Sequence, residues 1–278
     1  MQFLRNFYQR LLVQCAFLVA GVIGISSVAQ ASQMLQVLPP RIVIEKGRSA
    51  SLTLVNRNEE GGQYRIFTRN IRTNDFGRFE TITEAENGEL FADKMLRYSP
   101  RQVAVDGQSK QDVRVVVRKP KGLEDGEYRS HLVFRSLPKA GDDADSGGDA
   151  ISMKFNPTLE ITIPVIVRHG DLSAEIDLND LKVSQRDEEQ FLDFTISRDG
   201  NRSIYGEVVA WWTPEGDSEA VRIGLAKGIS VYYPNQIRHF SLEIPADLKL
   251  TQGTVKVEYN EDPTYGGEEK AYIEMKLP

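Results

Sequence analysis

Apolar and polar residues alternate along most of this chain. The longest alternation runs from Ile151 to Val167, where every odd position is apolar and most even positions are polar. Successive side chains of a strand point to opposite faces, so the pattern predicts one long, half-buried β-strand. Fully extended, it would span roughly 55 Å, whereas a domain of ~120 residues has a radius of gyration of about 14 Å. One end of the strand is therefore expected to lie outside its own core.

Shorter alternations fill the rest of the chain, separated by turn residues, and no long amphipathic helix is visible. The first series predicts strands at 41–46, 49–56, 63–72, 101–106, 111–118 and 127–136. After a hinge at Gly170, the second series predicts strands at 173–178, 190–197, 203–213, 236–244, 253–260 and 270–277. This pattern is typical of all-β sandwiches. We expect two domains, at 32–168 and 169–278.

The first 31 residues have the pattern of an export signal. Arg5 and Arg10 precede an apolar run from about residue 11 to 25, and Ala29-Gln30-Ala31 follows it. This order predicts a secretory signal peptide over 1–31, cleaved before Ser32. The alternative is an uncleaved membrane anchor, because the run is nearly long enough to span a bilayer. Gln14 interrupts the run, which favours cleavage, and we expect no membrane insertion afterwards.

Composition narrows the class of protein further. Cys15 is the only cysteine and lies in the predicted signal peptide, so the exported chain has no disulfide framework. The formal net charge is −6, and the signal peptide contributes two arginines and no acids. A nucleic-acid binder would carry a basic footprint instead, so no nucleic-acid partner is predicted.

The segment from Pro138 to Ala150 differs from its surroundings. It holds four aspartates and three glycines and almost no apolar side chains. Such a segment buries too little surface to offset its ordering entropy, so we expect a mobile loop. The alternative is a calcium loop, which the absence of flanking helices disfavours.

The sequence does not support an enzyme. It has no GxSxG elbow, P-loop or GxGxxG before a helix, and no cysteine nucleophile after processing. His131, His169 and His239 stand alone, without a second ligand at metal spacing. We therefore predict no catalysis, no metal and no cofactor.

The N-terminal half of the long strand carries an apolar row that we expect on a sheet edge. Exposed apolar edges favour pairing with another chain by strand addition. Pro157 and Pro164 suit an edge, because proline cannot donate to a central ladder. The alternative is that both ends are covered by their own domain, with a bend at Pro157. The row consists of Ile151, Met153, Phe155, Pro157 and Leu159.

Several segments resemble the PapD-like periplasmic chaperones of the chaperone-usher pilus pathway. They are LPPRIVIEKGRSASLTLVN, YSPRQVAVDGQSKQDVRVVVR, EYRSHLVFRSLP and ITIPVIVRHG, which together cover about Leu38 to Gly170. In the second domain DPTYGG is the best local likeness. The resemblance implies two immunoglobulin-like β-sandwich domains in an L-shaped arrangement. It also implies a periplasmic, non-enzymatic chaperone that caps pilin or fimbrial subunits by donor-strand complementation and delivers them for assembly, with an outer-membrane usher as a further partner.

The same resemblance assigns roles to individual residues. It implies that the donor side chains are Met153, Phe155, Pro157 and Leu159, with Ile151 extending the row. Arg41 matches the arginine that anchors the subunit's terminal carboxylate, but Pro164 stands where the family has a lysine. The family's charge network between the domains has candidates in Glu127, Arg168 and Asp262; the alternative for each is a surface charge.

A second interpretation keeps the export signal and the sandwiches but changes the role of the long strand. The chain would then be an exported immunoglobulin-like structural adhesin or pilus subunit, and the strand a permanent interaction element. Such a subunit should lack one strand of its own sandwich, whereas the first domain has a full set of predicted strands.

Overall fold

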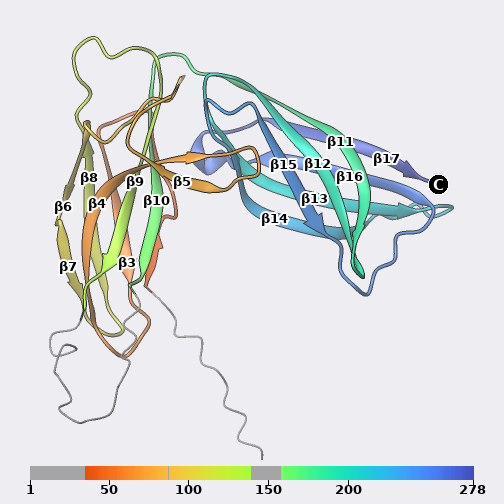
Figure 1. The fold of residues 1–278 in the computed structure, drawn as a ribbon, viewed down its shortest axis with the longest axis horizontal. Coiled ribbons are helices and arrows are strands. Elements are labelled where there is room, and N and C mark those ends of the chain that lie inside the picture. Colours follow the sequence, from red (N-terminus) through yellow and green to blue (C-terminus); the bar gives the residue numbers. More distant parts are fainter. Residues whose placement is uncertain (1–34, 87, 139–157) are drawn as a thin grey trace, which may run out of the picture. The chain divides into compact units, whose positions relative to one another are not determined.

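The computed structural model describes residues 35–86, 88–138 and 158–278. The predicted signal peptide, most of the acidic segment and the donor candidates Met153, Phe155 and Pro157 lie outside these residues. Within them the chain forms seventeen strands and one short 3₁₀ helix, so the predicted all-β fold is confirmed (Figure 1). The predicted division into domains at residue 168 remains a prediction.

The first ten strands form two sheets. The smaller sheet has the order β1 (Gln36–Leu38), β3 (Ser49–Val55), β8 (Lys110–Val117) and β6 (Leu96–Ser99). The larger sheet has the order β2 (Ile42–Ile44), β10 (Glu160–His169), β9 (Gly126–Ser136), β4 (Gly62–Thr73) and β5 (Phe79–Ile82). In addition, β7 (Gln102–Val105) pairs with β4. Strand β9 is central and is buried along most of its length.

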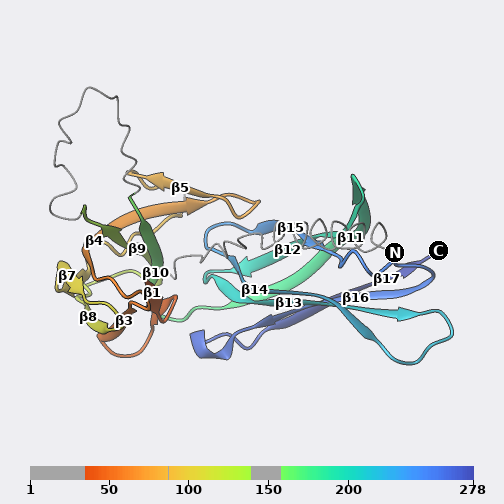
Figure 2. The same ribbon diagram turned by 90° about the horizontal axis from the view of Figure 1, so that it is seen from below.

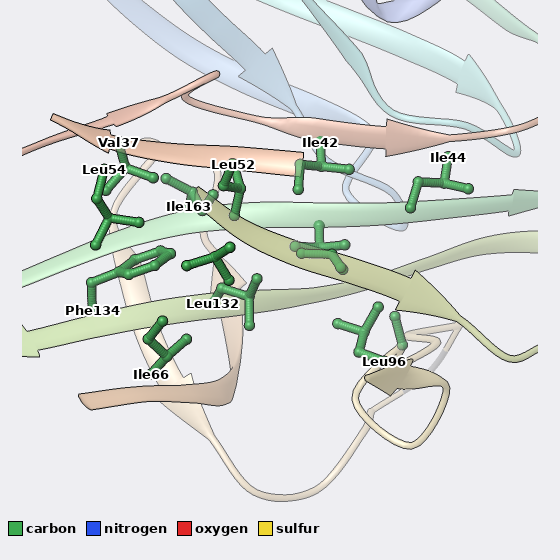
Figure 3. Close-up of a cluster of buried hydrophobic side chains, with 14 of the residues drawn as sticks. Val37, Ile42, Ile44, Leu52, Leu54, Ile66, Leu96, Leu132, Phe134 and Ile163 are labelled. Carbon is green, nitrogen blue, oxygen red and sulfur yellow. The ribbon is translucent and has the colours of Figure 1, made fainter. Parts of the chain in front are cut away.

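The alternation produces the core between these two sheets. One side-chain face of each strand points inward, where Leu52, Leu54, Leu132 and Phe134 are fully buried (Figure 3). At roughly 1.5 to 3 kcal/mol for each large apolar side chain, this burial is the main force that holds the sheets together. The residues of β9 and β10 with the opposite parity face outward from this core.

Strands β11 to β17 form a second pair of sheets. The first contains β11 (Ala174–Arg186), β12 (Glu189–Gly200) and β15 (Ile237–Glu243). The second has the order β14 (Val221–Val231), β13 (Ile204–Pro214), β16 (Gly253–Glu261) and β17 (Lys270–Leu277). Figure 2 shows β12 beside β15 and β13 beside β16, as their pairing requires. The 3₁₀ helix η1 (Pro263–Tyr265) lies between β16 and β17.

The connectivity of this second pair is immunoglobulin-like. Strands one, two and five of the seven form one sheet, and strands four, three, six and seven form the other. Antiparallel sheets that exchange strands in this way, packed over a common apolar core, define the immunoglobulin class of sandwich. Tyr259 and Ile196 are fully buried in that core.

Candidate functional site

Among the described residues, the N-terminal half of β10 has a partner strand on one side only. The whole of β10 pairs with β9, from Glu160 opposite Arg135 to His169 opposite Gly126. On the other side the short strand β2 pairs only with Val165 to Val167, in the parallel sense. Among the described residues no strand pairs with the other side of Glu160 to Pro164. This stretch is therefore an open backbone edge.

Leu159 continues β10 toward the residues that lie outside the description. Its N–H donates to Ser136 Oγ at 2.9 Å, and its carbonyl accepts from Ser136 N at 2.8 Å. It has the same parity as Ile161 and Ile163, which pack on the core, and it is itself half-buried. Of the four predicted donor side chains it is the one that the structure places, at the end of the core-facing row.

Glu160, the first residue of β10, is held by two arginines of the same sheet. Its carboxylate accepts hydrogen bonds from Arg69 on β4 and Arg135 on β9, with Arg69 Nη1 at 2.8 Å from Oε2. The hydrogen bond from Arg69 is the largest cause that holds the pKa of Glu160 below its usual value. The start of β10 is thus tied to its neighbour β9 and to β4, the next strand of the sheet.

Arg41, the predicted carboxylate anchor, immediately precedes β2 and is only 3% exposed. Its Nη2 donates to the hydroxyl of Tyr232 at 2.6 Å. The guanidinium carbon lies 3.8 Å from the ring centroid of Tyr205 and 5.1 Å from that of Tyr232, which are cation–π distances. Its Nε is buried and has no hydrogen-bond partner.

Arg129, on β9, also contacts the ring of Tyr232. Its guanidinium carbon is 4.1 Å from the Tyr232 ring centroid, and Nη2 donates to the carbonyl of Ile71 at 3.3 Å. Its Nη1 is buried without a partner. Burial lowers the pKa of Arg129 from its usual value, although Tyr232 and Glu127 oppose this shift. Two buried arginines therefore share one tyrosine.

His131 lies on the same outward face of β9, two residues after Arg129, and is 3% exposed. Neither of its ring nitrogens has a hydrogen-bond partner. Burial, together with the charges of Arg129 and Arg41, lowers the pKa of His131 to about 3, so the ring is neutral at physiological pH. The residue opposite it on β10 is Pro164, so the position where the family has a lysine carries no cation.

Glu127 and Arg168 form a buried ion pair, with Arg168 Nε 3.1 Å from Glu127 Oε2. The Ser203 hydroxyl donates to Glu127 Oε1, and the Ser203 N–H donates to Oε2 at 3.1 Å. Arg168 also donates to the carbonyls of Tyr265, at 3.1 Å, and Ser203, at 3.4 Å. Both charges are thus paired and hydrogen-bonded, as buried charges need to be. They link the first sandwich to residues next to the second.

Among the described residues Asp262 makes no hydrogen bond or ion pair with Glu127 or Arg168, and its membership of the network remains a prediction. Its carboxylate caps η1 by accepting from Thr264 N at 2.9 Å. The preceding residue, Glu261, is the buried acid, and it forms a bidentate pair with Arg202 at 2.7 and 2.9 Å. Adjacent residues of an extended chain face opposite ways, so only one of the two acids can point inward.

Comparison with known proteins finds distant structural similarity to solved fimbrial chaperones, whereas no known family profile and no curated protein matches the sequence. The CupB2 chaperone of Pseudomonas aeruginosa is 13% identical with a TM-score of 0.45, and the match covers 88% of this chain and 100% of that one. The SafB chaperone of Salmonella enterica, solved with the SafA pilin, is 12% identical with a TM-score of 0.44, over 87% and 96%. In the Acinetobacter baumannii complex of the CsuC chaperone with the CsuE subunit, the matched chain is 12% identical with a TM-score of 0.44. That match covers 87% of this chain and 97% of the other.

The chain resembles fimbrial chaperones in its fold.

The sequence alone missed Arg129, Tyr232, Arg202 and Glu261 as members of buried polar clusters. A signal for Arg129 was present, because Glu127, Arg129, His131 and Arg135 occupy one parity of β9 while Leu132 and Phe134 occupy the other. Polar side chains at most of the alternate positions of a central strand indicate a second packed face. No local signal pointed to Tyr232, which is 191 positions from Arg41.

No group of three or more His, Cys, Asp or Glu side chains within 35–86, 88–138 and 158–278 is arranged to hold a metal ion. No helix in this part of the chain is long and apolar enough to cross a membrane.

Proposed function

We propose that this chain is a periplasmic chaperone for pilus or fimbrial subunits that caps an incomplete subunit by donating the N-terminal extension of β10. The observation that carries the proposal is the open edge of β10 from Glu160 to Pro164. A subunit strand can add there by backbone hydrogen bonds, while alternate side chains fill pockets of the subunit. The predicted signal peptide supports export to the periplasm.

The parity of the strand supports the same donor residues. Ile161, Ile163 and Leu159 share the core-facing side of β10. If the strand continues toward the N-terminus, Pro157, Phe155 and Met153 fall on that side but beyond the core. They would then be free to enter the core of a client, and Ile151 would extend the row.

Arg41 is the proposed anchor of the client's terminal carboxylate, and Glu127 with Arg168 holds the base of the donor strand to Ser203. The alternative of a structural pilus subunit requires a sandwich that lacks a strand. The first sandwich instead has two sheets with strands on both faces of its core. This favours a chaperone that completes other chains, with no catalytic step and with an usher as the recipient of the complex.

The test is the double substitution Phe155→Ser and Leu159→Ser. Each large apolar side chain buried in a client contributes roughly 1.5 to 3 kcal/mol, so the pair should weaken subunit binding by about two to four orders of magnitude. Leu159 is half-buried, so the free chaperone should lose only about 1 kcal/mol of unfolding free energy. Co-purification of a co-expressed pilus subunit and urea unfolding of the free protein measure the two effects.

The matched control is Asn156→Ser with Thr158→Ser, which alters the same strand on its other parity and should retain the subunit. A second control is a subunit whose open groove is filled by a fused strand, which wild-type protein should not bind. Loss of several kcal/mol of stability in the Phe155/Leu159 variant would contradict the proposal, because those side chains would then belong to the chaperone's own core.

A further inference from the structure

Arg41, Arg129 and the neutral ring of His131 form a buried cluster of basic side chains on the outward face of the β2–β10–β9 region, and no acid of the described residues forms an ion pair with it. Buried in it are Arg41 Nε, Arg129 Nη1 and both ring nitrogens of His131, none of which has a partner. Most buried polar groups in folded proteins are hydrogen-bonded, so four orphans in one place call for an explanation. An acceptor group that binds here would supply it.

The nearby carboxylates are already engaged. Glu127 is bonded to Arg168 and Ser203, and Glu89 forms a salt bridge with Arg72 at 2.7 Å. Among the described residues neither Arg41 nor Arg129 forms an ion pair. Two buried guanidiniums without a carboxylate of their own make a favourable site for one from another molecule, because arginine binds carboxylates in bidentate geometry.

Tyr232 occupies the space between these cations. Arg41 and Arg129 both lie against its ring, at 5.1 and 4.1 Å from the centroid, and its hydroxyl accepts the Nη2 hydrogen bond of Arg41. A neutral hydroxyl accepts less strongly than a carboxylate, which offers two oxygens and about four lone-pair positions. Tyr232 follows the last residue of β14, in the loop before β15, so its ring is carried by a connection and not by a strand.

We propose that Tyr232 is a built-in occupant of an anion site formed by Arg41 and Arg129, and that a client's terminal carboxylate binds by displacing its hydroxyl. This inference rests on the proposed function for the identity of the ligand and adds two elements to it. Arg129 is the second cation of the anchor, and Tyr232 lowers the affinity of the empty site for stray anions.

The experiment uses the mature chain and a short acetylated peptide with a free C-terminal carboxylate, with its C-terminal amide as the comparison. The peptide is too short to pair with the donor strand. Binding is measured by titration, following the Nε–Hε NMR signals of the arginines. We expect Tyr232→Phe, which keeps the ring and removes the hydroxyl, to bind the carboxylate peptide about tenfold more tightly than wild type. Arg129→Gln should bind it at least about tenfold more weakly than wild type.

Tyr205→Phe is the matched control, because the Tyr205 ring also lies against Arg41, with its centroid 3.8 Å from the guanidinium carbon. The hydrogen bond of Arg41 goes to the hydroxyl of Tyr232 and not to that of Tyr205, so the affinity should not change. Tyr232→Ala, which removes the ring together with the hydroxyl, should also bind the carboxylate peptide more tightly than wild type. Equal affinity of Tyr232→Phe and wild type, equal binding of the amide, or no binding by any variant would overturn the inference.

Failure of the donor-strand proposal would look different. The Phe155→Ser/Leu159→Ser chain should bind the carboxylate peptide as wild type does, because the peptide does not use that strand. If this chain lost subunits but kept the peptide, both proposals would stand. If it kept subunits while Tyr232→Phe still bound the peptide more tightly, only the donor-strand proposal would fail.

Discussion

Glu127 and Arg168 are directly opposite each other on β9 and β10, and their side chains meet in a buried ion pair of 3.1 Å. Ser203 bonds to the same carboxylate through its N–H and its hydroxyl. The side-chain contacts of the pair are therefore made across one ladder, to Ser203 just before β13, and to Tyr265 of η1. The base of the proposed donor strand and the second sandwich are held by the same two charges.

We expect Glu127→Ala to destabilise the protein by about 3 to 5 kcal/mol, because it leaves the Arg168 guanidinium buried without its counter-charge. Replacing both residues, as Glu127→Leu with Arg168→Met, should cost much less than the sum of the single changes, since no unpaired charge remains. Urea unfolding of the three variants measures this. Glu160→Gln is the control for a partly exposed ion pair and should cost about 1 kcal/mol or less. Additive losses in the double variant would contradict the assignment.

Arg41→Ala should abolish subunit capture while the chain still folds. The loss of hydrogen bonds from a charged donor to the client's carboxylate should cost about 1.5 to 3 kcal/mol of binding free energy or more. Arg41→Lys keeps the charge but not the planar group that stacks on Tyr205, so it should restore capture only in part. Co-purification with a pilus subunit, with circular dichroism as the check of folding, gives the answer. Wild-type capture by Arg41→Ala would show that the client is anchored elsewhere.

His131 should make the protein less stable as the pH falls from 7 to 5. The pKa of His131 is lowered to about 3 in the folded chain, whereas an unfolded histidine titrates near about 6.5. Between pH 7 and 5 the unfolded state therefore binds the proton while the folded state does not. The contribution of His131 to the free energy of unfolding is complete above about pH 6.5 and decreases as the pH falls below that value. One such group accounts for about 2 kcal/mol between pH 7 and 5.

The measurement is urea unfolding at pH 7 and pH 5. His131→Leu should lose the histidine's part of the pH dependence, because no titrating group remains at that position. His169→Gln, a change at the end of β10, should retain it. An unchanged pH dependence in His131→Leu would mean that His131 is not the group responsible.

The alternation of side chains was sufficient to predict the class of fold and most strands. Burial of one parity is a local requirement, so the β9 and β10 patterns appear in the sequence as directly as in the sheets. Strand β14 was missed because Gly224, Ala226 and Gly228 weaken its pattern, and register shifts interrupt its pairing with β13. Strands β1, β5 and β6 have three or four residues each and owe their existence to their partners.

The sequence by itself therefore determined the class of fold and most strands, because alternation depends on spacing along one chain segment. Glu127 and Arg168 were candidates only through the family resemblance, and the donor row remains a prediction. Only the tertiary structure decided which charges are buried. It placed Tyr232 between Arg41 and Arg129, turned Glu261 inward and left Asp262 to cap η1. Such contacts join segments far apart in the chain, and the free energy that selects them comes from burial and pairing of charges, which no local pattern encodes.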